Sequence, residues 1–161
     1  MNSAQQLHTI PHRQYELNVD IKLETNKPLF TSSDKTIYKL KWITQQNYSN
    51  SAIVLVEIKG SEAIREASFC LYLSCHPHII RTFGLVNSPS NSIRLVQEYA
   101  PDGDLAELLR ERRFLPSENV LIEIFVQICD AMICLADNGI VHGDLGCRNY
   151  NITQITWIHV S

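Results

Sequence analysis

The sequence predicts an α+β fold in which the strands precede most of the helices. Before residue 100, apolar residues alternate with polar ones over several segments, which is the pattern of half-buried strands. After residue 104 they recur at helical spacing instead. Pro101–Gly103 breaks the chain between the two parts. We therefore expect two lobes, residues 15–100 and 101–161, after a polar extension over residues 1–14.

The first lobe is expected to contain an antiparallel sheet. Tyr15–Leu23 and Thr36–Ile43 alternate with a period of two, and Ala52–Lys59 is a mostly apolar, β-branched run typical of a central strand. Two shorter strands are expected over His78–Val86 and Ser92–Tyr99.

Three helices are expected. The first runs from an N-cap at Ser61 to about Ser74. A short helix follows Asp104, which is an N-cap with Glu107 in the capping-box position. The longest covers about residues 117–138 and stops at Gly139. Its apolar face is expected to consist of Val120, Leu121, Ile124, Phe125, Ile128, Met132 and Leu135.

Composition excludes several classes of protein. With 161 residues, 45% of them hydrophobic and 19% charged, the chain is long enough for one globular domain. A net charge of −3 argues against nucleic-acid binding. Residues 1–15 contain no apolar signal sequence, and Val120–Ala136 is interrupted by Glu123 and Asp130, so we expect no membrane span. Five cysteines without a signal sequence indicate reduced thiols and a cytoplasmic protein.

The loop after the longest helix carries the chemistry. Ile140–Asn149 reads I-V-H-G-D-L-G-C-R-N. It resembles the catalytic loop of protein kinases, H-R-D-L-x-x-x-N, and in particular the tyrosine-kinase form H-R-D-L-A-A-R-N. Serine/threonine kinases usually place a lysine where Gly146 stands, whereas Arg148 matches the arginine of the tyrosine-kinase form.

Other segments resemble kinase motifs in the family's order. They are Val56–Lys59 (V-A-I-K), Glu66 (the C-helix glutamate), His76–Ile80 (H-P-N-I-V), Leu95–Ala100 (last strand and hinge, with Gln97 as gatekeeper) and Gly103–Leu105. The resemblance covers about Leu23 to Asn149, so the chain is identified as a member of the protein kinase family. It implies a kinase-like α+β fold: an antiparallel five-stranded N-lobe with a C helix, then the first helices and catalytic loop of a helical C-lobe.

The resemblance implies transfer of the ATP γ-phosphate to a protein substrate, with ATP and Mg²⁺ as cofactors. Asp144 would orient the acceptor hydroxyl and accept its proton, and Arg148 would support a tyrosine in the acceptor site. Asn149 would supply an oxygen ligand to Mg²⁺.

The same resemblance places the nucleotide site on five residues. Lys59 would bind the α- and β-phosphates, and Glu66 would hold Lys59 in place. Ile37 matches the valine after the glycine-rich loop, and the backbone of Glu98 and Ala100 would hydrogen-bond adenine.

The sequence departs from the family pattern around the nucleotide. Phe30, Ser32 and Lys35 stand at the three glycine positions of the phosphate loop, where side chains should obstruct a close backbone approach. Glu57 replaces the small alanine above adenine, and Asn151 stands where a leucine usually lies below it.

Three further departures from the family pattern concern the lysine–glutamate ion pair, the contact to the activation loop and the length of the domain. Lys59 and Glu66 are only seven residues apart, so the helix must begin directly after the strand, and Glu62 is an alternative partner. Gly143 replaces the arginine that meets the activation-loop phosphate in many kinases. Trp157–Ser161 resembles the strand before the D-F-G motif, so we expect a fragment of the domain with its oligomeric state undetermined.

Two hypotheses of function follow. The first is a tyrosine-type protein kinase, favoured by Lys59, Asp144, Arg148 and Asn149 together. The second is a pseudokinase or partner-binding module without phosphotransfer, favoured by the altered phosphate loop and by Glu57. Binding of Mg-ATP distinguishes them, because a ligand of the folded state raises its stability.

Overall fold

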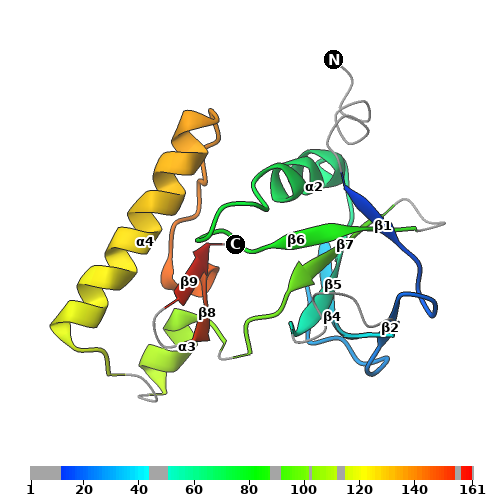
Figure 1. The fold of residues 1–161 in the computed structure, drawn as a ribbon, viewed down its shortest axis with the longest axis horizontal. Helices are drawn as coiled ribbons and strands as arrows, with labels where there is room; N and C mark the ends of the chain where they lie inside the picture. The colour runs from blue at the N-terminus through cyan, green and yellow to red at the C-terminus, as the bar shows by residue number, and fades with distance from the viewer. Residues whose placement is uncertain are drawn as a thin grey trace. The chain divides into compact units, whose positions relative to one another are not determined.

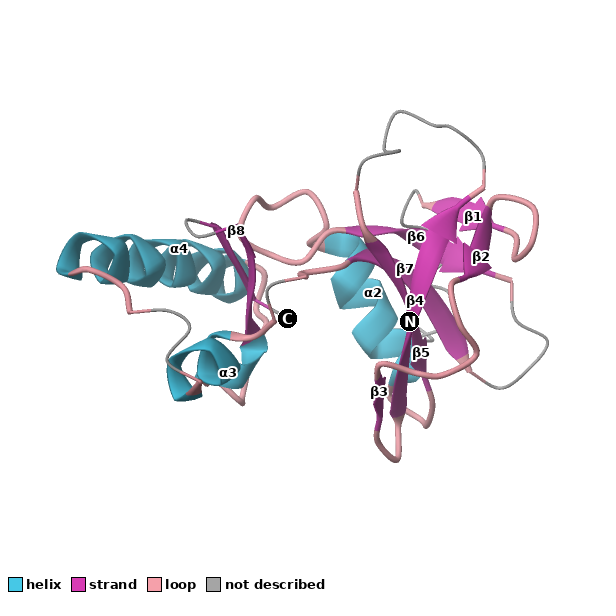
Figure 2. Cartoon of the chain, turned by 90° about the horizontal axis from the view of Figure 1, so that it is seen from below, coloured by secondary structure: helices cyan, strands magenta, loops and turns pink. Residues whose placement is uncertain are grey.

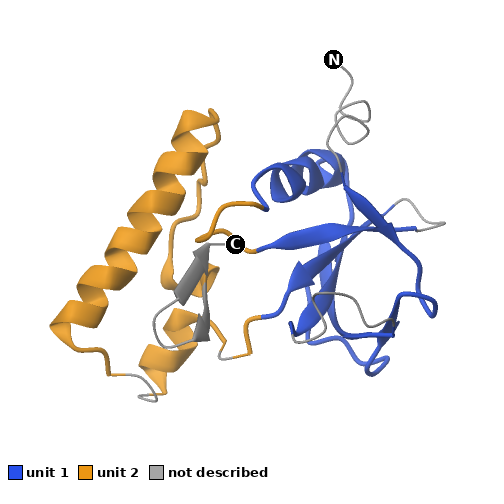
Figure 3. Ribbon diagram, in the orientation of Figure 1, with its two compact units in different colours: residues 1–74, 81–99 blue, residues 75–80, 100–161 orange. Residues whose placement is uncertain are grey.

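A computed structural model describes most of the chain: residues 12–43, 51–87, 92–101, 103–111, 115–154 and 157–160, with backbone only from residue 151 onward. The described part is a mixed α+β structure, as expected. The chain divides into two compact units, shown in Figure 3. Unit 1 comprises residues 1–74 and 81–99, and unit 2 comprises residues 75–80 and 100–161.

The described residues of unit 1 form one curled sheet and the helix α2 (Ala63–Tyr72) (Figure 1). Among the described residues its strands are β1 (Arg13–Tyr15), β2 (Ile21–Leu23), β3 (Phe30–Thr31), β4 (Lys35–Trp42), β5 (Ile53–Ile58), β6 (Thr82–Val86) and β7 (Ile93–Glu98). Their order is β1-β6-β7-β5-β4-β2, and β3 also pairs with β4. All pairs are antiparallel except β1 with β6.

The expected five-stranded sheet is therefore wrong in detail, because Tyr15–Leu23 is not one strand. Asn18 adopts a left-handed backbone with φ of 67°, and the Glu16 N–H donates to the Asp20 carboxylate at 2.9 Å. This turn separates β1 from β2, while Tyr15 remains buried. β2 and β3 follow one another along the same edge of β4, so together they replace the first expected strand.

The register of the three central strands decides which side chains share a face. Ile37 lies opposite Val56, and Val56 lies opposite Leu95. Thr36 and Glu57 form the neighbouring opposed pair, so their side chains point to the other face of the sheet. Every assignment of a side chain to one face or the other follows from this register.

Helix α2 (Ala63–Tyr72) covers the face that carries Ile37 and Val56 (Figure 2). The helix contributes Ala63, Ala67 and Leu71 to a buried cluster with Val54, Val56, Ile58 and Leu95. On the opposite face a second cluster comprises Tyr15, Ile21, Leu40, Ile53, Leu55, Val86 and Val96. The helix begins after Glu62 and makes no side-chain cap bond, so Ser61 is not the N-cap that the sequence predicted.

Unit 2 contains the helices predicted after residue 104. They are α3 (Leu105–Arg110) and α4 (Glu118–Asp137). The 3₁₀ turn η1 (Cys147–Asn149) was not predicted; it is followed by the hairpin of β8 (Tyr150–Gln154) and β9 (Trp157–Val160). The cap of α3 is confirmed, because the Asp104 carboxylate accepts from the Glu107 N–H at 2.7 Å. A strand was expected over Trp157–Ser161, and β9 covers Trp157–Val160 of it; β9 pairs with β8 in a two-stranded antiparallel sheet.

Helix α4 ends as predicted. Gly139 has φ of 67° and donates its N–H to Ala136 O at 2.9 Å, while the Ile140 N–H donates to Leu135 O at 2.9 Å. These two bonds form a Schellman motif, which satisfies the last carbonyls of the helix and sends the chain into the following loop.

The buried face of α4 agrees in part with the expected one, since Ile124, Ile128 and Leu135 belong to both. Ile124, Gln127, Ile128, Ala131 and Leu135 are buried, but Leu121 and Phe125 are exposed. The helix is long and apolar enough to meet the simple criteria for a membrane span, with 28% of its most apolar window buried. Helices in the core of globular proteins meet the same criteria.

Midway along α4, the Asp130 carboxylate lies 3.4 Å from His76 Nε2 and 3.7 Å from His78 Nε2.

A close backbone approach at Gly84 yields a test of the extra strand β1. A Cβ at this position would lie 2.1 Å from Arg13 O in β1. Gly84→Ala should therefore displace β1 and lower the free energy of unfolding by about 1–3 kcal/mol in urea titrations. Gly146→Ala is the control, because its Cβ would meet only the Arg148 side chain at 3.6 Å. Equal stability of the two variants would show that β1 does not pack against Gly84.

Candidate active site

The loop after α4 brings its three polar residues of interest together. The Arg148 guanidinium donates a hydrogen bond to the Asp144 carboxylate. The Asn149 amide donates to the backbone oxygen of Asp144 at 2.6 Å and to its Oδ2 at 3.2 Å. The backbone explains this geometry, because Gly143 has φ of 75° and η1 turns Arg148 and Asn149 back toward Asp144.

These contacts set the charge state of Asp144. The hydrogen bond from Arg148, and after it that from Asn149, lower the pKa of the Asp144 carboxyl below its usual value. Asp144 is therefore ionised at neutral pH. Its side chain is 62% exposed and that of Arg148 is 65% exposed, so a substrate can reach both groups from solvent.

In unit 1, Lys59 is not paired with Glu66 as the sequence predicted. Lys59 Nζ lies 3.9 Å from Glu57 Oε2, whereas Glu66 Oε1 lies 2.7 Å from Lys35 Nζ. Lys35 lies opposite Ile58, whose side chain is in the cluster under α2, so Lys35 points to the helix that carries Glu66. Lys59 follows Ile58 directly and shares the orientation of Glu57, on the other face.

Glu57 is a buried carboxylate with several partners. It accepts hydrogen bonds from Ser92 Oγ at 2.8 Å and Arg94 Nε at 2.9 Å. Burial raises the pKa of the Glu57 carboxyl, but the bonds from Ser92 and Arg94 outweigh it and leave the pKa below its usual value. Glu57 is thus an anion on the face of the sheet where the sequence resemblance expects a small alanine and Lys59.

Neither the Lys35–Glu66 pair nor the Glu57–Arg94 pair was predicted, although the sequence contains a signal for the second. Glu57 is the one charged residue of β5, Arg94 is the one basic residue of β7, and the two lie directly opposite each other. Opposite charges at one cross-strand position favour such a pair. The Lys35–Glu66 pair had no such signal, because it depends on the register between β4 and β5.

Of the other predicted nucleotide residues, Ile37 lies on a different face of the sheet from Lys59, and Glu98 and Ala100 make backbone hydrogen bonds. Ile37 packs into the cluster under α2, on the opposite face from Glu57 and Lys59. The Glu98 N–H donates to Arg81 O at 2.9 Å, within unit 1. Ala100, in unit 2, accepts from the Gly103 N–H at 3.4 Å. The register therefore does not bring Ile37 and Lys59 to one face.

The phosphate-loop positions form the hairpin between β3 and β4. The Ser32 N–H donates to Lys35 O at 2.8 Å, and the Lys35 N–H donates to Ser32 Oγ at 3.1 Å. Ser33 Oγ and Ser32 Oγ donate to the Asp34 carboxylate at 2.8 and 3.2 Å. These two hydroxyls, Ser33 first, lower the pKa of the Asp34 carboxyl. The hairpin tip therefore carries an anion beside the Lys35 cation.

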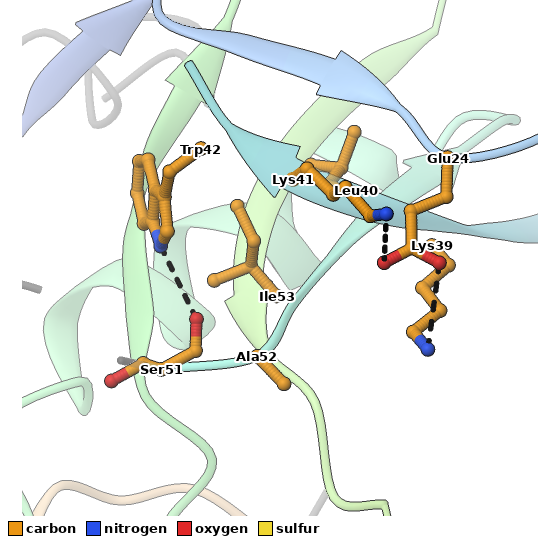
Figure 4. A pocket seen from close by; sticks show the side chains of 8 residues that line it. All are labelled: Glu24, Lys39, Leu40, Lys41, Trp42, Ser51, Ala52 and Ile53. Carbon is orange, nitrogen blue, oxygen red and sulfur yellow. Dashed lines mark hydrogen bonds and ion pairs between the residues drawn. The ribbon is translucent and has the colours of Figure 1, made fainter. Parts of the chain in front are cut away.

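A pocket of about 400 Å³ lies elsewhere on unit 1, along β4 and the start of β5 (Figure 4). Lys39 and Lys41 line it and both lie near the Glu24 carboxylate, at 3.5 and 3.8 Å. Trp42 Nε1 closes one side by donating to Ser51 O at 3.2 Å. None of the eight predicted site residues lines this pocket.

Comparison with known proteins identifies the family. The family described as protein tyrosine and serine/threonine kinase matches residues 29–161, which is most of the chain. The chain belongs to the protein kinase family.

Its curated relatives include kinases of both acceptor classes. The receptor tyrosine-protein kinase erbB-4 of Homo sapiens is 28% identical over 148 residues, covering 88% of this chain and 11% of the receptor. The serine/threonine-protein kinase SBK1 of Danio rerio is 29% identical over 150 residues, covering 91% of this chain and 36% of that kinase. The chain therefore spans only a minor part of each of these relatives.

The kinase family uses ATP and Mg²⁺, and the two units fit these groups unequally. In unit 2, Asp144 and Asn149 offer oxygen atoms, the ligand type that Mg²⁺ prefers while keeping several waters. No group of three or more His, Cys, Asp or Glu side chains in the described part of the chain is placed to hold a metal. In unit 1 the residues fit a polyphosphate less well, because a carboxylate, Glu57, stands beside Lys59 where the family pattern has a small side chain.

The carboxyl of Glu57 yields a pH prediction. The ordinary pKa of this carboxyl is 4.5, and its pKa in the folded state is lower. The ionised carboxylate therefore contributes its full stabilisation of the fold above about pH 4.5. This stabilisation is lost as pH falls through the folded-state pKa. Glu57→Gln should therefore be less stable at pH 7, and its free energy of unfolding should fall less steeply between about pH 5 and pH 3.

Urea unfolding at a series of pH values measures this slope. Glu62→Gln is the matched control, since that carboxylate is 75% exposed and pairs with Arg65 at 3.6 Å. The control should keep the wild-type slope. A wild-type slope in Glu57→Gln as well would contradict the buried network.

Proposed function

We propose that the chain is part of a kinase domain that transfers the ATP γ-phosphate to a tyrosine hydroxyl of a protein substrate. Residues 15–100 would form the N-lobe and residues 101–161 part of the C-lobe. The observation that supports this most strongly is the cluster of Asp144, Arg148 and Asn149, which are exposed or half-buried and joined by hydrogen bonds within one short loop. A cytoplasmic location is part of the proposal, supported by the five free thiols.

Phosphoryl transfer passes through a loose transition state, so the protein mainly positions groups and balances charge. Asp144 is ionised and exposed, and it can accept the hydrogen bond of the acceptor hydroxyl and then its proton. The Arg148 guanidinium keeps the Asp144 carboxylate oriented. Asn149 holds the loop closed through its amide nitrogen, and its carbonyl is the oxygen that would bind Mg²⁺, which neutralises phosphate charge when bound.

Tyrosine is the proposed acceptor because of two residues in this loop. Gly146 stands where serine/threonine kinases usually carry a lysine, and Arg148 matches the arginine of the tyrosine-kinase loop. Without a lysine at Gly146, no cation extends from that position toward the small hydroxyl of a serine. The relatives themselves divide between the two acceptor classes, so this choice rests on the loop.

A second candidate is a pseudokinase that binds partners without turning over ATP. The observation that favours it is in unit 1, where Lys59 lies by Glu57 and not by Glu66. Side chains at all three glycine positions of the phosphate loop support the same candidate.

Asp144→Asn tests the proposed reaction. The amide cannot take a proton, so phosphotransfer from labelled Mg-ATP to a tyrosine-containing peptide should fall at least about 100-fold. Nucleotide binding should remain near the wild-type level. The matched control is Asp137→Asn at the exposed end of α4, which should keep wild-type turnover. Unchanged turnover in Asp144→Asn would refute its role, and no turnover by wild-type protein would favour the second candidate.

The acceptor class is tested with two peptides that differ only in carrying tyrosine or serine. We expect the tyrosine peptide to be phosphorylated at least about tenfold faster, because the loop carries Arg148 and has no lysine at Gly146, as in the tyrosine-kinase form. The readout is the ratio of kcat/KM for the two peptides. A preference for serine would overturn the assignment to the tyrosine class while leaving phosphotransfer itself intact.

A further inference from the structure

We propose that Lys35, in the hairpin between β3 and β4, is the lysine that binds the phosphate chain of the nucleotide in this protein, in place of Lys59. The inference rests on the proposed function, since it assumes that the chain binds ATP. It reassigns the phosphate-binding cation from the motif position to the residue that the α2 glutamate actually holds.

Glu66 of helix α2 forms its ion pair with Lys35. A lysine that binds phosphate needs a carboxylate to hold its flexible side chain in one orientation. Glu66 Oε1 lies 2.7 Å from Lys35 Nζ, and the two side chains are 38% and 40% exposed. An ammonium group has three donors, and one hydrogen bond to Glu66 leaves the others for an anion.

Lys59, in contrast, lies beside a buried carboxylate on the other face of the sheet. Its Nζ lies 3.9 Å from the Glu57 carboxylate, which also binds Ser92 and Arg94. At 3.9 Å, and with its own side chain 53% exposed, Lys59 is positioned by this carboxylate less firmly than Lys35 is positioned by Glu66 at 2.7 Å. Lys35 lies on the opposite face of the sheet, so Glu57 does not share its surroundings.

The backbone of Lys35 is fixed in position. It begins β4, where it lies opposite Ile58, and its N–H and carbonyl both bond to Ser32 across the hairpin turn. The Cα is therefore fixed by two strands and by the turn. Lys35 also stands at the third glycine position of the phosphate loop, so a side chain there supplies a cation near the place where the family's backbone approaches phosphate.

One neighbouring charge opposes this role. The Asp34 carboxylate lies at the hairpin tip next to Lys35 and is held ionised by the hydroxyls of Ser33 and Ser32. Because like charges repel, removing this anion should strengthen binding of a polyphosphate. Asp34→Asn is therefore expected to bind nucleotide more tightly than the wild-type chain, which makes it a variant with a gain of binding.

The test compares Lys35→Met with Lys59→Met, a matched pair that each removes one lysine from unit 1. Binding of a fluorescent ATP analogue in Mg²⁺ is measured by titration, with thermal unfolding as the check that each variant is folded. We expect Lys35→Met to weaken binding at least about tenfold and Lys59→Met less than about twofold. Lys35→Arg, which keeps the cation, should retain most of the affinity, and Glu66→Gln should lose part of it.

The outcomes separate this inference from the proposed function. Loss of binding in Lys59→Met with retention in Lys35→Met would overturn the inference and leave the kinase proposal standing. Equal losses in both variants would also overturn it, because net charge and not position would then explain the effect. No binding by the wild-type chain at millimolar nucleotide would refute both. If Lys35→Met unfolds, nucleotide binding by Asp34→Asn is the deciding measurement. Unchanged or weaker binding by Asp34→Asn would then contradict the role of Lys35.

Discussion

The register between β4 and β5 is the constraint on which the charged groups of unit 1, including the proposed phosphate-binding lysine, depend. In a sheet, successive side chains point to opposite faces, so a slip of one residue would exchange the two faces completely. With Ile37 opposite Val56, Lys35 and Ile37 face α2, while Glu57 and Lys59 face away from it. The pairing of Lys35 with Glu66 and of Lys59 with Glu57 follows from this single fact.

The energetics of the two faces agree with this arrangement. On the α2 face, apolar residues of β5 and of the helix form a continuous buried cluster, with the Lys35–Glu66 pair at its exposed margin. On the other face, Glu57 is buried and needs Ser92 and Arg94 to offset its desolvation. Removing one partner of such a network leaves a buried charge without compensation, so the network holds Glu57 and its strand in register.

The loop of Asp144, Arg148 and Asn149 depends on local structure and not on the sheet. The Schellman motif at Gly139 ends α4 at a defined residue, and Gly143 and η1 then fold the chain so that Arg148 and Asn149 reach Asp144. All these contacts lie within a few residues of one another. This explains how unit 2 retains a kinase-like loop while unit 1 departs from the family pattern.

The same contrast explains what the sequence could and could not predict. The helices, the cap at Asp104, the stop at Gly139 and the membership of the kinase family were predictable, because short-range patterns and motifs determine them. The split of Tyr15–Leu23 depends on the turn at Asn18, and the partner of Glu66 depends on strand register. Alternation of polar and apolar residues shows that strands exist but not which residue faces which across two strands.

The most direct test of this account is the register itself. Nuclear Overhauser contacts between backbone protons of β4 and β5, measured on the labelled full chain, report which residues lie opposite each other. The account predicts contacts that place Ile37 opposite Val56 and Lys35 opposite Ile58. Contacts that place Ile37 opposite Glu57 would contradict it, because Lys59 and Ile37 would then share one face and Lys35 would lose its position beside Glu66.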